Sequence, residues 1–359
     1  MRIAILGVGL IGGSIGLAAR ERLEPRTEVT GFDPDADGLA AAQDRGAIGS
    51  TASSVAEALD GAEVCFLCAP VDRLPELLNS AIEHAASDCA ITDVGSTKRA
   101  IAASTADERF VGGHPIAGSE GTGIGHARSD LFDGAAWYLT PGEQASGVLY
   151  ERLHRLVAAL GAHPIAIDPE SHDRLLATVS HVPHVLANVL VSQAARTLTQ
   201  EDESLPRIGP SFRDATRVAG ANPSIWNAIY FSNAEAIAAE LDETIERLSA
   251  VAGALRAGDE PAIAAWGERA REDRRRLLES ELAGGALHEL RVTVPNEPGI
   301  VAQVALALGR AGVNIADMTL SPAADMRSGA ITLWITGDQA AARARELIAE
   351  LGFAVAEAS

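Results

Sequence analysis

The sequence predicts an α/β protein of three domains: a doubly wound parallel sheet, an all-helical domain and a smaller α+β domain. Strand and helix patterns alternate over residues 1–168, the order that gives a parallel sheet with helices on both faces. Strand patterns disappear over residues 169–283 and return over 287–359 in the order βαββαβ. A chain of 359 residues is also too long for one typical core, so several domains are expected.

The first strand leads directly into a glycine-rich turn. Residues 1–6 are apolar and β-branched, and an Ala-rich helical pattern follows the turn to about Arg22. A G-x-G-x-x-G motif in this context is typical of a Rossmann-type dinucleotide site, where the backbone approaches a pyrophosphate at the helix N-terminus. The alternative is a glycine-rich turn without a ligand. The residues predicted to contact the cofactor here are Gly7, Gly9, Leu10, Ile11 and Gly12.

An acidic residue ends the second predicted strand, Thr27–Asp33. Asp33 follows Gly12 by roughly 20 residues, the spacing at which an acid hydrogen-bonds the hydroxyls of an adenosine ribose. A carboxylate there repels a 2′-phosphate, and no arginine follows until Arg45. The sequence therefore predicts NAD as the cofactor in preference to NADP.

Two further strands are predicted to end at the same edge of the sheet. Glu63–Pro70 is an apolar strand that ends in Ala69 and Pro70, and Cys89–Gly95 precedes Ser96. Ligands of doubly wound sheets lie beyond the carboxyl ends of the strands, so these loops should line the cofactor cleft. We expect Ser96 to cap the next helix and to donate a hydrogen bond into the cleft, although capping alone would also explain a serine here.

One histidine, His114, follows a glycine pair and precedes a proline in the segment Phe110–Glu120. We predict a loop in which Gly112 and Gly113 allow close backbone approach and Pro115 restricts the chain. An imidazole held in this way could act as a general base near neutral pH. A surface histidine beside a Gly-Pro turn is the alternative.

Composition and charge exclude several classes of function. The net charge of −20, from 49 acidic and 29 basic residues, disfavours nucleic acid and anionic membranes as partners. An anionic substrate would need a local cluster of cationic groups or helix N-termini. No apolar run of about 18 residues and no signal peptide is apparent. The odd number of cysteines, three, argues against a disulfide framework, so we expect a soluble cytoplasmic protein.

Two other kinds of chemistry are also disfavoured. Cys65 and Cys68 form a C-x-x-C inside an apolar strand without a second pair, so neither a metal site nor a redox site is expected. Ala117 replaces the first glycine of a G-x-S-x-G motif around Ser119, which argues against a serine hydrolase.

The helical region contains two groups of polar residues. Ser180 and His184 are spaced i, i+4 and should share a helix face, with Pro183 kinking the helix, whereas His181 should face elsewhere. Buried structural roles would also explain these histidines. Arg213 and Arg217 are again spaced i, i+4 and could form the positive cluster that an anionic substrate needs; alternatively, Asp214 pairs with one of them at the surface.

The C-terminal region begins with a predicted linker over residues 281–289. Strands are then predicted over 290–295, 313–320 and 329–336, with a final strand near Phe353 and helices between. The order βαββαβ is that of a ferredoxin-like domain.

Taken together, the motifs of this chain resemble those of a known family. The chain resembles the prephenate dehydrogenase family over about residues 1–282, and its tail resembles an ACT domain. The motifs that carry the resemblance are the N-terminal G-x-G-x-x-G, Asp93–Lys98, Gly113–Glu120, Ser180–His184 and Phe212–Arg217, with Pro295–Ile300 and Gly312–Ile315 in the tail.

The resemblance implies the oxidative decarboxylation of prephenate to 4-hydroxyphenylpyruvate in tyrosine biosynthesis, with reduction of NAD. His114 would accept the proton of the ring hydroxyl, Ser96 would hydrogen-bond that hydroxyl, and Arg217 would hold the ring carboxylate. His184 and Ser180 would contact the pyruvyl side chain. Further residues expected around the substrate are Ser119, Glu120, Arg213 and Trp226. The family often has three glycines where this chain has Gly209–Ser211.

The resemblance also implies regulation and assembly. An ACT domain would bind an amino acid, most plausibly tyrosine as an inhibitor, and the expected contacts are Asn296, Pro298, Gly299 and Ile300. A tail that serves only dimerisation is the alternative, and a homodimer through the helical domain is expected. Arogenate could replace prephenate as substrate.

Two rival functions are weaker. A β-hydroxy-acid dehydrogenase would need a lysine in the helical domain, but none occurs between Lys98 and Ser359. A non-catalytic sensor of NAD and amino acids would not need His114, Ser96 and Arg217 together.

Overall fold

The computed structural model describes residues 1–118, 121–142, 144–198, 208–281, 286–295, 300, 303–304, 307–308, 311, 313, 315–323 and 328–357. The chain divides into two compact units, Met1–Ile245 and Glu246–Ser359, which are described in turn. The boundaries predicted at residues 168 and 283 are finer than this division and remain predictions.

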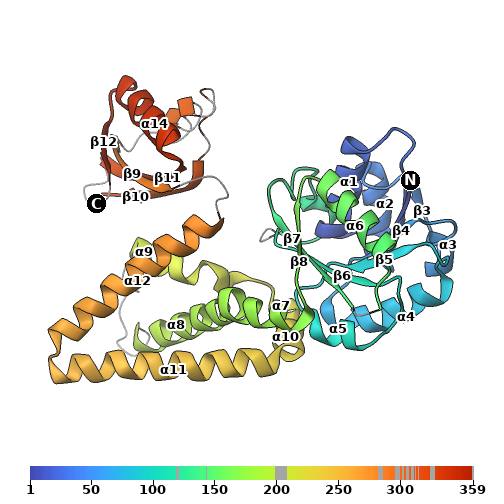
Figure 1. The fold of residues 1–359 in the computed structure, drawn as a ribbon, viewed down its shortest axis with the longest axis horizontal. Coiled ribbons are helices and arrows are strands. Elements are labelled where there is room, and N and C mark those ends of the chain that lie inside the picture. Colours follow the sequence, from blue (N-terminus) through green and yellow to red (C-terminus); the bar gives the residue numbers. More distant parts are fainter. Residues whose placement is uncertain are drawn as a thin grey trace. The chain divides into compact units, whose positions relative to one another are not determined.

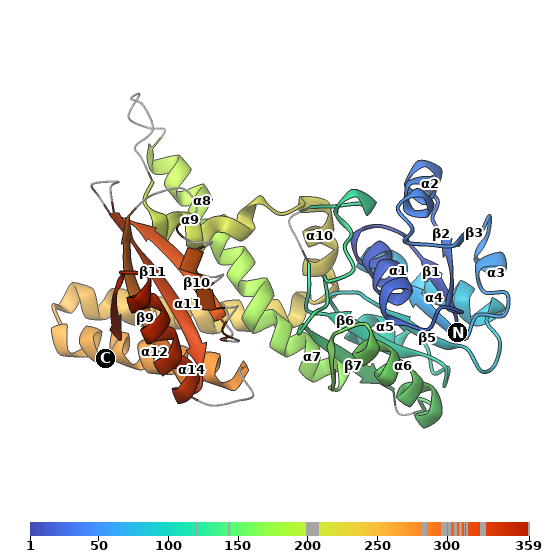
Figure 2. The ribbon, with the colours of Figure 1, turned by 90° about the horizontal axis from the view of Figure 1, so that it is seen from above.

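A five-stranded parallel sheet forms the centre of the first unit. Its order is β3-β2-β1-β4-β5, and β3 lies at the outer edge in both ribbon views (Figures 1 and 2). Alternate residues of β1 point to opposite faces, so the strand is apolar throughout. The strands are β1 (Arg2–Leu6), β2 (Glu28–Phe32), β3 (Ser50–Thr51), β4 (Val64–Leu67) and β5 (Ala90–Asp93).

Helices cover both faces of this sheet, which confirms the doubly wound prediction. Ile3 and Ile5 pack in one cluster with α1 and α6, whereas Ala4 and Leu6 pack in another with α3, α4 and α5. Figure 1 shows α1 and α6 on one side and α4 and α5 on the other. The helices are α1 (Leu10–Arg22), α2 (Ala36–Asp44), α3 (Val55–Ala58), α4 (Leu74–His84), α5 (Arg99–Ala103) and α6 (Gly147–Ala159).

A three-stranded sheet, β6-β7-β8, continues the parallel sheet through a bridge between Ile91 and Phe110. Strand β7 runs antiparallel to β6 and parallel to β8, so this second sheet is mixed, whereas the five-stranded sheet is parallel as predicted. Among the described residues between β6 and β7, only the 3₁₀ turn Ile124–His126 is helical, and a parallel return normally requires a helical crossover. The strands are β6 (Val111–Pro115), β7 (Ala136–Pro141) and β8 (His163–Ala166).

The placement of His114 also differs from the prediction. His114 lies within β6, opposite Tyr138 of β7, and not in a loop. The glycine pair before it does permit close approach: a Cβ on Gly113 would lie 2.5 Å from the carbonyl oxygen of Asp93, and one on Gly112 would lie 2.3 Å from Oγ1 of Thr140. Strand pairing therefore holds this histidine more rigidly than a turn would.

A buried ion pair joins β5 to β6. The carboxylate of Asp93 accepts hydrogen bonds from the backbone N–H groups of Gly95 (2.8 Å) and Gly113 (3.1 Å) and pairs with the ammonium group of Lys98. Lys98 also donates to the carbonyl of Gly113 at 2.8 Å. Both charged side chains are fully buried, and Lys98 is the only lysine of the chain. Burial lowers the pKa of Lys98, and the charge of Asp93 opposes that effect.

The remainder of the first unit is helical. Its first helices form one path in which a π-helical turn, Ala177–His181, separates α7 from α8. Pro183 has no N–H to donate to the preceding turn of this continuous path, and the π-helical irregularity lies directly before it. The elements are α7 (Pro169–Leu176), α8 (Val182–Leu198), α9 (Pro210–Thr216), the 3₁₀ turn Arg217–Gly220, α10 (Pro223–Ser232) and α11 (Ala234–Ala257).

By length and composition alone, the helical path Pro169–Arg196 could span a membrane. Core helices meet the same criterion, and this one contains His172, Asp173 and His181, all buried against other parts of the unit.

The second unit contains α12 and a four-stranded sheet of order β10-β11-β9-β12, with every neighbouring pair antiparallel. Residues 287–289 were predicted as linker but pair with β11 as part of β9, because the partner strand decides where a strand begins. Helix α14 contributes Ala341, Ala344 and Ile348 to the core. The elements are α12 (Glu260–Glu281), β9 (Leu287–Pro295), β10 (Ile315–Pro322), β11 (Ser328–Thr336), α14 (Asp338–Glu350) and β12 (Ala354–Glu357).

The buried ion pair yields a prediction about stability. Replacing Lys98 with Met leaves the carboxylate of Asp93 buried without its cation, which should lower the free energy of unfolding by about 3–5 kcal/mol. Arg99→Met is the matched control, because Arg99 pairs with Glu235 at the exposed surface and should contribute at most about 1 kcal/mol. Urea denaturation of both variants measures the difference; equal losses would contradict a stabilising role for the buried pair.

Candidate active site

The glycine-rich turn after β1 is held against the two neighbouring strands. The N–H of Gly7 donates to the carbonyl of Phe32 at 2.8 Å, and the N–H of Val8 donates to the carboxylate of Asp33 at 2.9 Å. Gly7 has a φ of +104°, and a Cβ there would lie 2.3 Å from the carbonyl oxygen of Cys68. The turn therefore needs glycine for both its conformation and its packing.

The same turn fits a dinucleotide. No atom lies within 4 Å of the position that a Cβ on Gly9 would take, so the backbone is open where a pyrophosphate would approach. A Cβ on Gly12 would instead lie 2.0 Å from the carbonyl oxygen of Gly7, so only glycine at this position lets the helix pack closely against the turn. Helix α1 begins at Leu10 and Ile11 without a side-chain cap, so its N-terminal N–H groups face the turn.

The other predicted cofactor residues lie at the carboxyl ends of neighbouring strands. Asp33 follows β2, Ala69 and Pro70 follow β4, and Ser96 follows β5. Strands β2, β1, β4 and β5 are adjacent in this order, so the structure brings these residues to one edge. Asp33 is half-buried and its carboxylate accepts from the turn and from the N–H of Asp35.

Ser96 does not cap the next helix, contrary to the prediction. Helix α5 begins at Arg99, and the carboxylate of Asp173 accepts the N–H groups of Lys98 (2.7 Å) and Arg99 (2.9 Å). A carboxylate from α7 thus satisfies the first donors of α5 in place of a local serine. Ser96 is half-buried and lies in the turn between Asp93 and this helix.

The environment of His114 keeps its imidazole neutral. The residue is 8% exposed, and its Nδ1 lies 2.9 Å from Nε2 of His172. Burial lowers the pKa of His114 well below its usual value, and His172, Lys98 and His181 lower it further. An unprotonated imidazole near neutral pH is the state that a general base requires.

Two pairs of aromatic rings in contact involve the histidines of this region. His114 contacts His172 edge-on, and His181 contacts Trp226 edge-on with ring centroids 6.0 Å apart. Burial lowers the pKa of His181 to about 4; Asp173 opposes the shift and the neighbouring histidines add to it. His181 was expected to face elsewhere, but the π-helical turn and a hydrogen bond from Asn233 place it beside Trp226.

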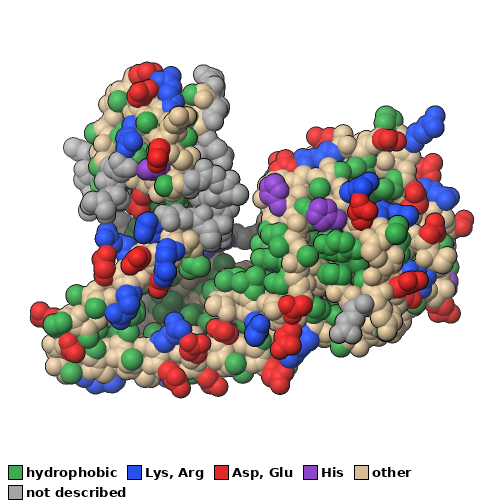
Figure 3. Space-filling model, viewed as in Figure 1, with side chains coloured by type: hydrophobic (Ala, Val, Ile, Leu, Met, Phe, Trp, Pro, Cys, Tyr) green, Lys and Arg blue, Asp and Glu red, His purple; other side chains and the backbone are tan. Residues whose placement is uncertain are grey.

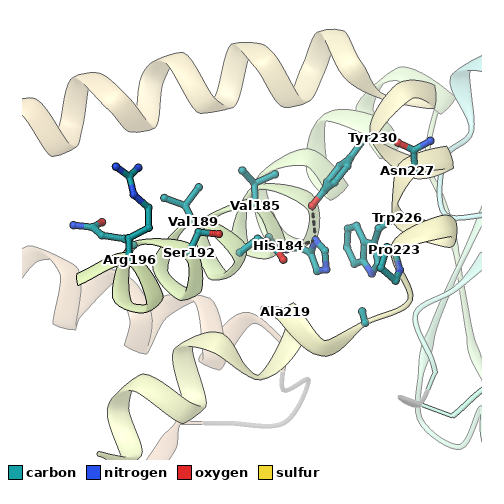
Figure 4. Close-up of a pocket in the computed structure, with 13 residues that line it drawn as sticks. His184, Val185, Val189, Ser192, Arg196, Ala219, Pro223, Trp226, Asn227 and Tyr230 are labelled. Atoms are coloured by element: carbon teal, nitrogen blue, oxygen red, sulfur yellow. Dashed lines mark hydrogen bonds between the residues drawn. The ribbon is translucent and has the colours of Figure 1, made fainter. Parts of the chain in front are cut away.

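Trp226 and His184 form the wall of a pocket of about 970 Å³ (Figure 4). The two rings stack with centroids 3.6 Å apart and an interplanar angle of 3°. The hydroxyl of Tyr230 donates to Nδ1 of His184, and burial lowers the pKa of this histidine. The lining residues are His184, Val185, Asn188, Val189, Ser192, Gln193, Arg196, Ala219, Ala221, Pro223, Trp226, Asn227 and Tyr230.

Other predicted substrate residues do not line this pocket. Ser180 is half-buried in the π-helical turn, and Arg213 and Arg217 are exposed on α9 and the 3₁₀ turn after it. The i, i+4 register expected between Ser180 and His184 is interrupted by the π-helical turn. Ser119 and Glu120 lie outside the described residues, as do Asn296, Pro298 and Gly299 of the predicted effector site. Ile300 is described and packs against the core of the second unit.

The structure adds residues that the sequence analysis missed. Arg196 supplies a cation to the pocket, in line with His184, Asn188 and Ser192 along α8. The i, i+4 spacing of these four polar residues was the signal in the sequence. His172 and Asp173 had no such signal, because their partners lie on other elements.

Charges of both signs are mixed over the face seen in Figure 3, so the net charge of −20 does not arise from one acidic patch there. Cys65 and Cys89 are buried and burial raises the pKa of both thiols, that of Cys89 to about 11. Within the described ranges, no group of three His, Cys, Asp or Glu residues could hold a metal ion.

Two models of known protein families match this chain, in agreement with its architecture. The family model of the prephenate dehydrogenase nucleotide-binding domain matches residues 15–166, and that of the prephenate dehydrogenase dimerization domain matches residues 168–268. The first model covers β2, β4 and β5 but begins after β1 and the glycine turn, and the second covers α8 and α10, whose residues line the pocket.

Individual relatives agree. Prephenate dehydrogenase of Bacillus subtilis is 31% identical over 362 residues, covering 96% of this chain and 95% of the relative. The structure of prephenate dehydrogenase from A. aeolicus in complex with hydroxyphenyl propionate and NAD⁺ has a TM-score of 0.73 at 26% identity, covering 77% of this chain and 98% of that one. Arogenate dehydrogenase of Synechocystis has a TM-score of 0.67 at 27% identity, covering 77% and 100%. The chain therefore belongs to the prephenate dehydrogenase family and is an NAD-dependent oxidoreductase.

Proposed function

We propose that this enzyme converts prephenate to 4-hydroxyphenylpyruvate by oxidative decarboxylation, in the biosynthesis of tyrosine in the cytoplasm. The proposal rests on a buried histidine whose pKa is lowered by burial, in the strand next to β5 and beside the edge proposed for the dinucleotide. The identity to a prephenate dehydrogenase over 96% of the chain supports the choice of substrate.

The cofactor and the protein contribute different steps of the proposed reaction. NAD, bound at the β1–α1 turn and Asp33, supplies the acceptor for the hydride from the substrate ring. His114 takes the proton of the ring hydroxyl, and Ser96, after the adjacent strand β5, hydrogen-bonds the same hydroxyl. Loss of the ring carboxylate as carbon dioxide then restores aromaticity. Base catalysis of this kind contributes about 10²–10⁴-fold to the rate.

The helical region would bind the rest of the substrate. His184, held by Tyr230 and stacked on Trp226, would contact the pyruvyl group, and Ser180 would add a hydrogen bond. Arg217 would hold the ring carboxylate, with Arg213 one turn away. Arg196 is a second candidate for a carboxylate because it lines the pocket itself.

Arogenate is the alternative substrate, either alone or beside prephenate. It differs in bearing an amino group where prephenate has a keto group. The likeness to the Synechocystis arogenate dehydrogenase is similar in extent to that with the A. aeolicus enzyme, so the family does not decide between them. A neutral His184 favours the keto acid, because an ammonium group would prefer a carboxylate partner.

We propose that the tail is an ACT domain that binds tyrosine as a feedback inhibitor near residues 296–300. The antiparallel sheet of order β10-β11-β9-β12, with α14 packed on it, supports a ferredoxin-like fold. About a quarter of this chain has no counterpart in the A. aeolicus structure, which is itself covered almost completely.

We also propose a homodimer through the helical domain. The match to a dimerization domain supports it, as does an apolar stripe on α11. Ile245, Leu248 and Leu255 on this helix are 58%, 58% and 62% exposed. Apolar side chains in such a stripe are usually covered by a partner.

The first test of the function is a four-way rate comparison that pairs prephenate and arogenate with NAD and NADP, with and without tyrosine. Reduction of NAD with prephenate should be the fastest combination, because Asp33 repels a 2′-phosphate, and tyrosine should lower it. Absorbance of the reduced cofactor measures all rates. Absence of reduction in every combination would remove the enzymatic function and favour a sensor of NAD and amino acids.

His114→Asn should lower kcat by about 10²–10⁴-fold, because asparagine cannot accept the hydroxyl proton. The dissociation constant for NAD, measured by tryptophan fluorescence, should stay within about twofold, since Asn retains much of the size of His. His163→Asn, at an exposed histidine of β8, is the matched control and should keep wild-type turnover. Wild-type turnover in His114→Asn would exclude this residue as the base.

The pH dependence should reflect the lowered pKa of His114. The neutral imidazole is the active form and is lost only as the pH falls through that lowered value, so kcat/KM should stay level from pH 7.5 to about pH 6. The profile is measured with saturating NAD, and circular dichroism at each pH controls for unfolding. An acid limb centred at or above pH 6.5 would contradict the neutral base.

The carboxylate contact can be assigned with three variants. Arg217→Ala should raise the KM for prephenate about tenfold or more, since a hydrogen bond to a charged group contributes about 1.5–3 kcal/mol. Arg213→Ala, on the preceding turn, is the matched control and should change KM less. If Arg196→Ala alone raises KM, the contact belongs to α8 and not to Arg217.

A further inference from the structure

Behind His114, a second histidine and a carboxylate form a chain of hydrogen bonds. Nδ1 of His114 lies 2.9 Å from Nε2 of His172, and Nδ1 of His172 lies 2.8 Å from Oδ1 of Asp173. His172 is fully buried and Asp173 is 2% exposed. The role of His114 as a base, on which the inference rests, uses neither His172 nor Asp173 directly.

His172 and Asp173 are both held in place by contacts with other elements. The carboxylate of Asp173 accepts the N–H groups of Lys98 and Arg99, and its backbone carbonyl accepts from Asn233 at 2.7 Å. The ring of His172 also contacts Tyr138 edge-on, with centroids 5.6 Å apart and an interplanar angle of 82°. Tyr138 is the cross-strand neighbour of His114 in β7. His172 therefore has little freedom to turn away.

The donors and acceptors available determine which atom donates in each of these hydrogen bonds. An ionised carboxylate can only accept, so Nδ1 of His172 donates to Asp173. A neutral His172 then offers the lone pair of Nε2, and Nδ1 of His114 must donate to it. That leaves the lone pair of His114 on Nε2.

We propose that His172 and Asp173 are positioning residues that hold His114 in the tautomer with its proton on Nδ1, so that Nε2 is the atom that accepts the substrate proton. In the step itself the O–H bond of the ring hydroxyl breaks and an N–H bond forms at Nε2. The resulting imidazolium keeps its Nδ1–H bond to His172, with the negative charge of Asp173 beyond it. The same logic orients the histidine in carboxylate–histidine pairs of other enzymes.

Two variants separate hydrogen-bond polarity from packing. In His172→Gln, the amide oxygen can accept from Nδ1–H of His114 while the amide nitrogen donates to Asp173, so the direction of the chain is kept. In His172→Phe, a ring of similar size remains but no acceptor does. Asp173→Asn is unsuitable, because the same carboxylate also satisfies the N–H groups at the start of α5.

The decisive measurement is ¹⁵N NMR of the full-length protein labelled at histidine, with the His114 signals assigned by their loss in His114→Asn. The wild-type protein should show a protonated Nδ1 and an unprotonated Nε2 on His114, and His172→Phe should show the other tautomer as well. In His172→Phe, kcat should fall at least about tenfold, the scale of lost outer-shell partners, without a matching change in the dissociation constant for NAD. His172→Gln should retain more of the wild-type kcat than His172→Phe.

Each outcome of these measurements either supports or overturns the proposal. A proton on Nε2 of His114 in the wild-type protein, as a protonated His172 would impose, overturns the proposal, and so does an unchanged tautomer in His172→Phe. If His172→Phe fails to fold, His172→Gln still tests the proposal, since a wild-type tautomer with retained kcat supports it and a loss of both overturns it. The NMR measurement needs no substrate, so a protein that shows the predicted tautomers but oxidises neither prephenate nor arogenate would refute the proposed function and not this inference.

Discussion

The buried carboxylate of Asp93 is the constraint on which the site depends. A charge in a protein interior is tolerated only when it is paired and hydrogen-bonded, and this one meets an ammonium group and two backbone N–H groups. Those donors come from the turn after β5, from the residue that precedes α5 and from β6. The pair thereby sets how closely β6 approaches β5, and only glycine at position 113 permits that approach. His114 follows immediately and takes its place from this contact.

A second carboxylate, Asp173, connects the helical region to the same edge. It caps α5, accepts from His172 and is itself held through its carbonyl by Asn233. The hydroxyls of Thr97 and Ser232 add a hydrogen bond of 2.7 Å between the two regions. Elements from both regions therefore enclose His114, which explains its burial and the lowered pKa of its imidazole. The lowered pKa of His114 is therefore a property of the contact between the two regions and not of one element.

The net negative charge of the chain would repel an anionic substrate, so cationic groups are needed close to the site. A net charge of −20 would oppose the approach of the dianionic substrate proposed above, and Lys98 cannot help directly because its charge is paired with that of Asp93. Arg196 of α8 lines the helical pocket together with His184, whereas Arg213 and Arg217 are exposed on α9 and the following 3₁₀ turn. Arginine suits such a site because its planar group can bind a carboxylate through two hydrogen bonds.

The sequence by itself determined the parts of this protein that local patterns encode. The glycine motif with Asp33 specified the Rossmann-type domain and its cofactor, because Gly7 and Gly12 meet steric requirements of the turn and Gly9 leaves the backbone open. The Gly-Gly-His-Pro segment singled out His114, the base proposed here, and the change of periodicity near residue 169 marked the helical region. Only the tertiary structure decided that His114 lies in a strand, that Asp173 and not Ser96 caps α5, and that a π-helical turn precedes α8. These features rest on contacts between residues as far as 75 positions apart, such as Lys98 and Asp173, and no local pattern records which distant partner will satisfy a buried polar group.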